Sequence, residues 1–398
     1  MRPTQHLLRR PRALLIDGNS VLYGAYYGTP PLHSTHDNDT NVNGVYTLLR
    51  TVRNHIATEQ VHHAAVCWDR PEPTFRHRLM PSYKAQRSST PDDLRPQFNL
   101  AKEALAALGV PQFERAGFEA DDLLATLSHA LQQEGTPGGV DVRLVSADKD
   151  LLQLVRPGVV DLIHPFSSTK GVRGHDQVLE DWGVEPDQLP VLFALMGDAA
   201  DNVKGVTGIG KKIGGRLLNE YRTMEGILAA AAAVPTTHRS NTTRGLHLMR
   251  AFVKKMKDTP EEGLSGNEVN VEKGLLSPEE YLQLLETMHR MRTDVGNVLT
   301  VGGEGEEEGV LEQLRVVDTG RAFQTFVDKH GFHSIAPLGA ATSRTSLGAL
   351  GASLGASGAL GVGSTPVRAV EAEVPLNAVT FNNMEDKEDA LEDEILLE

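Results

Sequence analysis

Three aspartates of this chain stand where apolar, strand-like segments end, and their positions suggest metal chemistry. Asp17, Asp69 and Asp148 each close such a segment. In a parallel sheet these ends share one edge, where α/β proteins place their ligands. Carboxylates gathered around one point repel one another unless cations lie between them. The pattern indicates a site for divalent metal ions, although Asp17 alone would also fit a cap of the following helix.

A second acidic cluster opens an expected helix. The segment Glu119-Ala120-Asp121-Asp122 precedes a helical pattern over 123–132, and Asp150 lies two residues beyond Asp148. The helix dipole favours acidic side chains at such a helix start. Three acids within four residues exceed what capping requires, so we assign this cluster to the same site.

A third acidic group consists of Asp198 and Asp201, which are separated by two alanines in an expected helix. Residues three apart on a helix project from one face, so both carboxylates would reach one ion or its waters. Two hard divalent cations about 4 Å apart would activate a water and stabilise the departing oxygen of a phosphodiester. No side-chain nucleophile is required.

Basic residues suggest where a phosphate would bind. Tyr83, Lys84 and Arg87 set an aromatic ring beside two cations at helical spacing. One interpretation is a solvated basic face. In the functional interpretation, Lys84 and Arg87 steady the scissile phosphate while Tyr83 stacks on an unpaired base.

A glycine-rich turn follows Asp201 directly. Its residues Gly208 and Gly210 would bring backbone amides close to a phosphate, and Lys211, Lys212 and Arg216 would add charge. The segment lacks the full spacing of a nucleotide-binding loop and follows a helix instead of a strand. A helix-turn-helix that binds a nucleic-acid duplex fits better.

The elements that position these residues form two predicted domains. Strand and helix patterns alternate over 13–173, which predicts a parallel sheet covered by helices such as 41–57 and 94–108. From 174 to 335 the pattern is mainly helical, with a polar insertion at about 229–276. Gly, Ala, Ser and Leu repeats followed by an acidic run predict a disordered tail over 336–398.

Composition limits the classes of function. The formal net charge is −14, but 384–398 alone carries eight acidic residues and one lysine, so the total does not exclude a polyanionic partner. No apolar run is long enough to cross a bilayer, and we expect no membrane partner. The single Cys67 excludes a disulfide within one chain and gives no support to a thiolate zinc site.

The N-terminal segment 1–12 holds four arginines and no acid. That composition fits either a mitochondrial presequence or a plain basic arm of an intracellular soluble protein.

Taken in order, these motifs resemble the 5′ nuclease family of bacterial DNA polymerase I and phage flap endonucleases. The resemblance covers about 13–334 and rests on Ile16-Asp17-Gly18, Trp68-Asp69, Tyr83-Lys84-x-x-Arg87, Glu119-Ala120-Asp121-Asp122, Asp148-Lys149-Asp150, Gly197-Asp198-Ala199-Ala200-Asp201-Asn202, Gly205-Val206-x-Gly208-Ile209-Gly210 and Arg292-Thr293-Asp294-Val295. It implies an α/β, PIN-like nuclease core with a parallel sheet, a helical arch at about 70–98 and a helical DNA-binding (helix-three-turn-helix) subdomain.

The resemblance also implies roles and ligands. Two Mg²⁺ ions, with Mn²⁺ as a substitute, would be bound by two groups of carboxylates: Asp17, Asp69, Glu119, Asp121 and Asp122 around the first, and Asp148, Asp150, Asp198 and Asp201 around the second. A K⁺ ion would be held at the helix-turn-helix. The expected activity is a 5′-3′ exonuclease and 5′-flap endonuclease of DNA replication, repair or primer removal, acting as a monomer on flaps, nicks and RNA primers.

Three departures from the family pattern stand out. Gly24 occupies the place of a usual arginine, so one phosphate contact is either missing or supplied by Arg70, Arg76 or Arg78. The insertion at about 229–276 has no counterpart, and no polymerase domain follows, as in the stand-alone members.

Two alternative functions stay open. A DNA-binding scaffold without catalysis is favoured weakly by Gly24 and disfavoured by the complete carboxylate set. A single-strand RNA nuclease with a similar acidic edge would have no use for a duplex-binding turn.

Overall fold

The computed structural model describes residues 10–35, 40–133, 135, 139–166, 171–235, 241–258, 276–296, 309–335 and 338. The predicted acidic tail and most of the N-terminal arm lie outside this range, as does 259–275 of the predicted insertion.

A six-stranded sheet lies at the centre of the molecule, with strand order β3-β2-β1-β4-β5-β6. Its strands are β1 (Arg12–Asp17), β2 (His63–Trp68), β3 (Gln112–Glu114), β4 (Asp141–Val145), β5 (Val160–Ile163) and β6 (Val172–Arg173). All neighbours pair in parallel except β5 and β6. The predicted α/β class is thus confirmed. Because the chain runs from β1 to one side and then returns to its other side as β4, the strand order switches direction beside β1, and ligands bind at such points.

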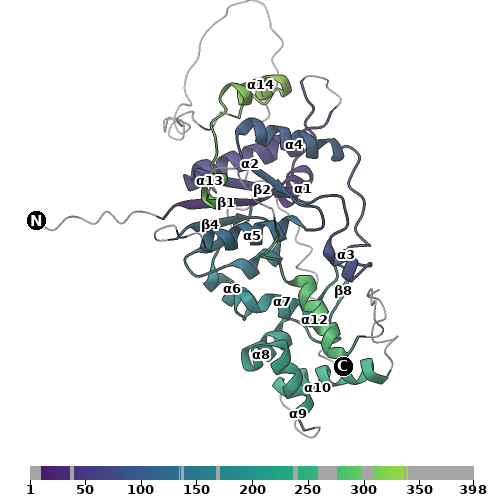
Figure 1. The fold of residues 1–398 in the computed structure, drawn as a ribbon. Coiled ribbons are helices and arrows are strands. Elements are labelled where there is room, and N and C mark those ends of the chain that lie inside the picture. The colour runs from purple at the N-terminus through teal and green to yellow at the C-terminus, as the bar shows by residue number, and fades with distance from the viewer. Residues whose placement is uncertain are drawn as a thin grey trace, which may run out of the picture.

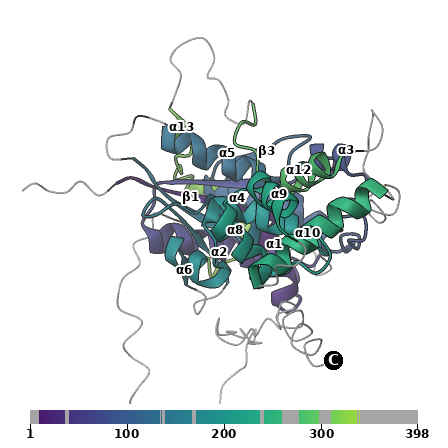
Figure 2. The ribbon, with the colours of Figure 1, turned by 90° about the horizontal axis from the view of Figure 1, so that it is seen from below.

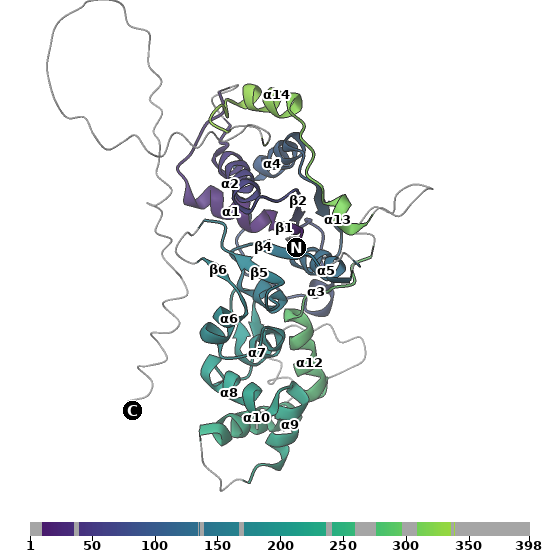
Figure 3. The same cartoon turned by 90° about the vertical axis from the view of Figure 1, so that its left-hand side faces the viewer.

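Helices cover both faces of this sheet (Figures 1 and 3). One face packs against α1 (Gly18–Gly28), α2 (Asn43–Glu59) and α4 (Arg95–Leu108), and the other against α5 (Ala120–Gln133) and the 3₁₀ helix η1 (Lys149–Leu154). Side chains of β1 alternate between the two cores: Leu14 and Ile16 enter the first, and Leu15 enters the second. This period of two, with both faces buried, is what a central parallel strand requires.

A helical domain follows the sheet along the chain and lies at one end of the molecule, which Figure 2 views from below. It contains α6 (His175–Trp182), the 3₁₀ helix η2 (Pro186–Gln188), α7 (Leu189–Met196), the hairpin β7 (Gly197–Asp198) and β8 (Val203–Lys204), α8 (Lys211–Tyr221), α9 (Met224–Ala233), α10 (Asn241–Asp258) and α12 (Pro278–His289). Residues 229–233 and 241–258 of the predicted insertion therefore form the end of α9 and all of α10. Leu246, Met249 and Met256 of α10 are buried in the core that it shares with α8 and α9.

The predicted helical arch at about 70–98 has a different conformation. It holds one short helix, α3 (Phe75–Leu79), followed by turns over 81–87, and α4 begins only at Arg95. The last described segment carries α13 (Val310–Gln313), which packs against α5, and α14 (Arg321–His330), which packs against α4. Within the described residues, no helix combines the length and the apolar character needed to cross a membrane.

Candidate metal centre

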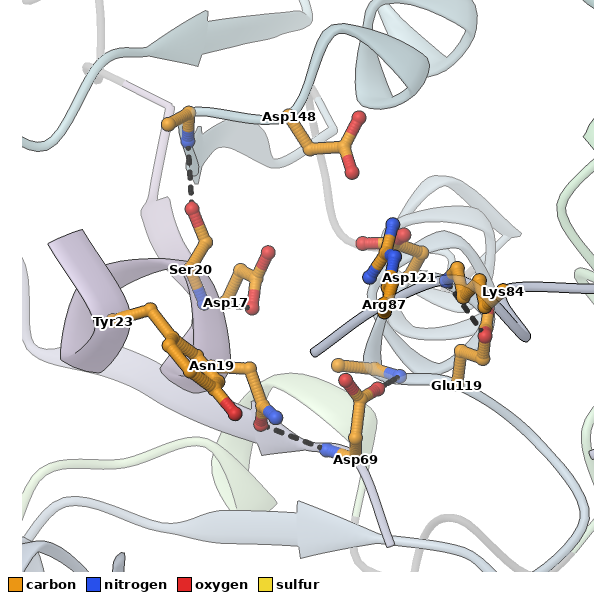
Figure 4. A pocket seen from close by; sticks show the side chains of 12 residues that line it. Asp17, Asn19, Ser20, Tyr23, Asp69, Lys84, Arg87, Glu119, Asp121 and Asp148 are labelled. Atoms are coloured by element: carbon orange, nitrogen blue, oxygen red, sulfur yellow. Dashed lines mark hydrogen bonds and ion pairs between the residues drawn. The ribbon is translucent and has the colours of Figure 1, made fainter. Parts of the chain in front are cut away.

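A cavity of about 370 Å³ opens at the carboxyl-terminal edge of the sheet (Figure 4). It is lined by five acidic and two basic side chains, contributed by strand ends, by the start of α5 and by the segment after α3: Asp17, Asp69, Glu119, Asp121 and Asp148, with Lys84 and Arg87. The structure thus brings together most of the carboxylates that the sequence assigned to one site. Asn19, Ser20 and Tyr23 of α1 complete its wall.

Asp17 occupies the centre of this edge because β1 is the central strand. Its carboxylate caps α1 by accepting from the Ser20 amide at 2.9 Å, and it accepts from the Ser146 hydroxyl at 2.8 Å. The predicted cap is therefore confirmed, and the same side chain also lines the cavity. Burial and the nearby Asp69 raise the pKa of Asp17 to about 7, so the bare site resists full ionisation.

Asp69 links β2 to the start of α5. Its carboxylate accepts from the Ala120 amide at 2.7 Å, and its own amide donates to Asn19 Oδ1 at 3.0 Å. Burial, then repulsion by Glu119, raises the pKa of Asp69. The pKa of Asp121 is raised strongly, by burial first and then by the charges of Asp148 and Asp17. These carboxylates share one electrostatic environment.

The second predicted group lies beside the first. Asp148 caps η1 by accepting from the Asp150 amide at 2.8 Å, and burial raises the pKa of both carboxyls. The Oδ1 atom of Asp150 is buried and has no hydrogen-bond partner in the described structure. Lys149 lies 3.3 Å from Asp198. Burial alone would raise the pKa of Asp198, but the charges of Lys149 and His289 and the hydrogen bonds from Lys149 and the Asp201 amide together lower it.

The prediction that Asp198 and Asp201 lie in a helix is wrong. Both residues belong to the β7-β8 hairpin, in which Asp198 Oδ1 accepts from the amides of Ala200 and Asp201 at 2.8 and 3.2 Å. An aspartate that bonds the backbone two and three residues ahead stabilises a turn. Asp201 lies on the far side of the basic segment and accepts from Arg87 at 2.5 Å and from the Tyr83 hydroxyl at 3.1 Å.

The basic segment is also not helical. Lys84 has a φ of 56°, a left-handed conformation, and its amide donates to the Asp201 carbonyl. Its ammonium donates to Glu119 at 2.8 Å. Burial alone would raise the pKa of Glu119, but the charges of Lys84 and Arg76 and the hydrogen bonds from Lys84 and Tyr83 together lower it. Lys84 and Arg87 line the cavity as predicted. Tyr83 is only 4% exposed and lies between Glu119 and Asp201, so the prediction that it stacks on a base is wrong for this conformation.

Asp122 does not belong to the metal-ligand set, contrary to the prediction. Its side chain is fully buried and forms two hydrogen bonds with Arg76, at 2.8 and 3.0 Å. The same contact removes Arg76 from the candidates for a phosphate contact. Arg70 is engaged by Glu72 and Glu114, whereas Arg78 is exposed.

Gly24 is explained by packing. A Cβ atom at this position of α1 would lie 2.5 Å from Phe166 Cε2, closer than real contacts allow. The ring of Phe166 therefore occupies the space that an arginine stem would need.

The glycine-rich turn lies between β8 and α8. Gly208 has a φ of 85°, which favours glycine, and Gly210 precedes the first residue of α8. Lys212 and Arg216 are exposed, and the Lys211 ammonium lies 4.8 Å from the centre of the Trp182 ring. The turn thus offers backbone amides and cations at one helix start.

Several positioning residues escaped the sequence analysis. Ser146 bonds both Asp17 and the Asp148 amide, and Gln86 donates to the carbonyls of Ala199 and Ala200. Asn19 and Ser20 directly follow the Asp17-Gly18 turn, and that position in the sequence could have identified them as residues near the site. Gln86 gave no signal, because its partner is more than a hundred residues away.

The donor set fits hard divalent cations. It consists of carboxylate oxygens, which Mg²⁺ prefers. The Asp150 Oδ1 atom has no hydrogen-bond partner in the described structure, and burial together with neighbouring carboxylates raises the pKa of Asp121 and Asp150. Among the described residues, no three acidic, histidine or cysteine side chains converge tightly enough to hold an ion by themselves. Mg²⁺ often binds through one or two carboxylates and several waters, which suits such an open arrangement.

Comparisons with known proteins agree with these features. Residues 12–183 match the 5′-3′ exonuclease N-terminal resolvase-like domain, and residues 184–257 match the 5′-3′ exonuclease C-terminal SAM fold. The second match includes most of the segment that was predicted to be an insertion without counterpart, so that prediction is wrong as far as residue 257.

Individual relatives carry related names. A 5′-3′ exonuclease of Bacillus subtilis (strain 168) is 37% identical over 59% of this chain and 79% of that protein. DNA polymerase I of Rhizobium leguminosarum is 38% identical over 62% of this chain, which spans 24% of the polymerase's length. Among solved structures, T5 5′-exonuclease with bound zinc has a TM-score of 0.46 at 21% identity, over 70% of this chain and 100% of that one.

Proposed function

This chain belongs to the 5′-3′ exonuclease family, and on that premise we propose that it cleaves DNA near 5′ ends with the help of two divalent metal ions, Mg²⁺ in the cell. The observation that supports this most directly is the cavity itself, where five carboxylates face two cations at the switch point of a parallel sheet.

Two groups of side chains would hold the ions. The first comprises Asp17, Asp69, Glu119 and Asp121, and the second Asp148, Asp150, Asp198 and Asp201. Bound divalent ions would supply an activated water and stabilise the departing oxygen. Ser20 and Ser146 orient Asp17, and the Ala120 amide orients Asp69, so that these carboxylates are held in place before an ion arrives.

The phosphate would be bound by cations that already line the cavity. Lys84 and Arg87 are now paired with Glu119 and Asp201, and metal ions at those carboxylates would release both cations toward the substrate. A duplex would lie along the start of α8, on Gly208, Gly210, Lys211, Lys212 and Arg216, with K⁺ bound at the same turn. We propose 5′ flaps, nicks and primer ends as substrates and a monomer as the active form.

A direct assay tests this proposal. Purified protein is incubated with 5′-labelled flap, nicked and single-stranded DNA, with Mg²⁺ or with excess EDTA. We expect short 5′ products from the flap substrate in Mg²⁺ alone. Duplex binding without cleavage under every metal condition would favour the scaffold, and preferential cleavage of single-stranded RNA would favour the third hypothesis.

A further inference from the structure

Next to the cavity, Arg76 and Asp122 form a buried ion pair. Arg76 comes from α3 and is 3% exposed, and Asp122 comes from the first turn of α5 and is 0% exposed. Two parallel hydrogen bonds of 2.8 and 3.0 Å join the guanidinium to the carboxylate. Such a bidentate contact fixes orientation as well as distance.

The guanidinium reaches two further parts of the molecule. Its Nε donates to the Met288 carbonyl at 2.8 Å and its Nη2 to the Arg290 carbonyl at 3.3 Å, both at the C-terminal end of α12. Its Nη1 lies 3.4 Å from Glu119 in the cavity wall. Four hydrogen bonds and this ion pair thus connect the guanidinium to α5, to Glu119 and to the end of α12.

Asp122 is equally occupied. Besides Arg76, its Oδ2 accepts from the Glu119 amide at 3.1 Å and its Oδ1 from the Arg292 amide at 2.9 Å. An ionised carboxylate offers about four lone-pair positions. All are used within the protein, so Asp122 has none left for a metal ion.

We propose that Arg76 and Asp122 are positioning residues that set the distance between the helical domain and the carboxylate cavity, and thereby the phosphodiester that is cut. This inference rests on the proposed function. The α12 helix packs against α7 and α10 of the domain that carries the duplex-binding turn, so its anchored end relates that turn to the cavity. The same pair holds Glu119, which also contacts Lys84.

The contact of Arg76 and Asp122 with the end of α12, which we call the joint, would determine the position of the cut. A duplex held at α8 presents its 5′ end to the cavity at a distance that the protein determines. If the end of α12 moves relative to α5, a neighbouring phosphodiester enters the cavity instead. A loosened joint would therefore spread the cut over adjacent positions, while the ion-binding carboxylates stay in place.

The test compares Arg76→Met, Asp122→Leu and the double variant with Asp121→Asn, a neighbouring aspartate that faces the cavity. Each single change leaves a buried charge without its partner, so the double variant, which removes both, is the one expected to fold like the original protein. Folding is checked by circular dichroism, and the double variant carries the test if the single variants do not fold.

Three measurements are made on each variant: Mn²⁺ affinity by calorimetry, the distance between nitroxide labels on Thr58→Cys in α2 and Glu225→Cys in α9, and product lengths on a labelled flap. The native Cys67 is buried, which favours labelling at the introduced sites. For the double variant we expect Mn²⁺ affinity near that of the original, a broader distance distribution and several adjacent products. Asp121→Asn should lose about tenfold or more in Mn²⁺ affinity and keep the original distance distribution.

Two results would overturn the inference. One is a double variant with the original distance distribution. The other is an Mn²⁺ affinity of the double variant that falls as far as that of Asp121→Asn, which would make Asp122 an ion ligand. If the original protein cut no substrate, the proposed function would fail, while the distance and Mn²⁺ measurements would still decide whether this pair positions the helical domain.

Discussion

Individual carboxylates of the cavity are buried, which favours the neutral acid, but they must be ionised to bind a metal ion. Asp17 shows this most clearly, since burial raises its pKa from an ordinary 3.8 to about 7, whereas a metal ion requires the ionised form. The cost of ionising the bare cavity is what a bound cation removes. Metal affinity and stability should therefore both depend on pH in the range of this pKa.

We predict that the metal-free protein loses stability as pH rises from about 4 to about 7. A group whose folded pKa is above its unfolded pKa binds more protons in the folded state, so its contribution is complete below the unfolded value and disappears as pH passes the folded value. Asp121, Asp148 and Asp150 shift in the same direction. Thermal unfolding in EDTA measures the effect, and Asp17→Asn should flatten the profile. A melting temperature that rises steadily over this interval would contradict the prediction.

A second prediction concerns the acidic residues of the second group. Asp148→Asn or Asp201→Asn should abolish Mg²⁺-dependent cleavage and leave duplex binding nearly unchanged. Asp148 lines the cavity, Asp201 pairs with Arg87, which also lines it, and neither change touches α8. Cleavage assays and fluorescence anisotropy measure the two effects. Cleavage within about tenfold of the original protein would argue against a two-metal site.

Lys84→Ala should slow cleavage more than it weakens binding. Lys84 lines the cavity beside Glu119, where it would meet charge that develops on the scissile phosphate, and an interaction made mainly in the transition state appears in the rate constant. Since Gly24 supplies no cation, the loss should be on the order of a hundredfold or more. Single-turnover kinetics at saturating flap substrate separate rate from affinity, with exposed Lys254→Ala as the control. Weaker binding at an unchanged rate would make Lys84 a backbone anchor.

At the residue scale, the sequence predicted which carboxylates gather but not which way each one faces. Asp17, Asp69 and Asp148 end parallel strands, and that rule alone places them on one edge. Asp121 and Asp122 are adjacent at one helix start, but Asp121 lines the cavity whereas Asp122 is buried against Arg76. Arg76 lies 46 residues earlier in the chain than Asp122. No local pattern contains such a partner.

At the scale of elements, helix ends were predictable where the chain carries a local stop signal. Gly109 ends α4 in a left-handed conformation, and Ser277 and Glu280 form the capping box that starts α12. The segments around Lys84 and Asp201 lack such signals. A spacing of three fits both a helix and a turn, and here hydrogen bonds between the two segments, including Asn202 to the Ser82 carbonyl at 2.8 Å, select turns in both.

The start of α8 is the element that we expect to bind duplex DNA, and the double variant Lys211→Ala, Lys212→Ala tests it. Duplex affinity should fall, and the dependence of log affinity on log salt should become shallower by about one unit for each phosphate that the variant no longer binds. Anisotropy at several salt concentrations measures both quantities, with the exposed Lys257→Ala as a matched control. An unchanged slope would place the duplex elsewhere.

At the scale of the whole molecule, the chain returns to its first domain after completing the helical one. The Ala64 amide donates to the Leu314 carbonyl and the Val316 amide to the His62 carbonyl, both at 2.8 Å, so 314–316 runs along β2. Then α14 packs beside α4, as Figure 3 shows. This return lies beyond the regions that match the family, and no local pattern in the sequence indicates where it packs.

Two truncations test the contributions of this returning segment and of the acidic tail one at a time. Ending the chain after Leu338 should leave the melting temperature and flap cleavage unchanged, because the composition of the removed segment, rich in Gly, Ala and Ser and then acidic, does not form a core.

Ending the chain after residue 308 should destabilise the sheet domain strongly. It removes Phe323, Phe326 and Phe332 from the core beside α4, and each such side chain contributes about 1.5–3 kcal/mol when fully buried. Because a domain's net stability is only about 5–15 kcal/mol, the shorter chain should unfold at a much lower temperature or remain insoluble. Calorimetry of the two truncated proteins measures the difference. Equal melting temperatures would show that the returning segment is dispensable, and a large loss in the longer truncated protein would show that the tail contributes to the fold.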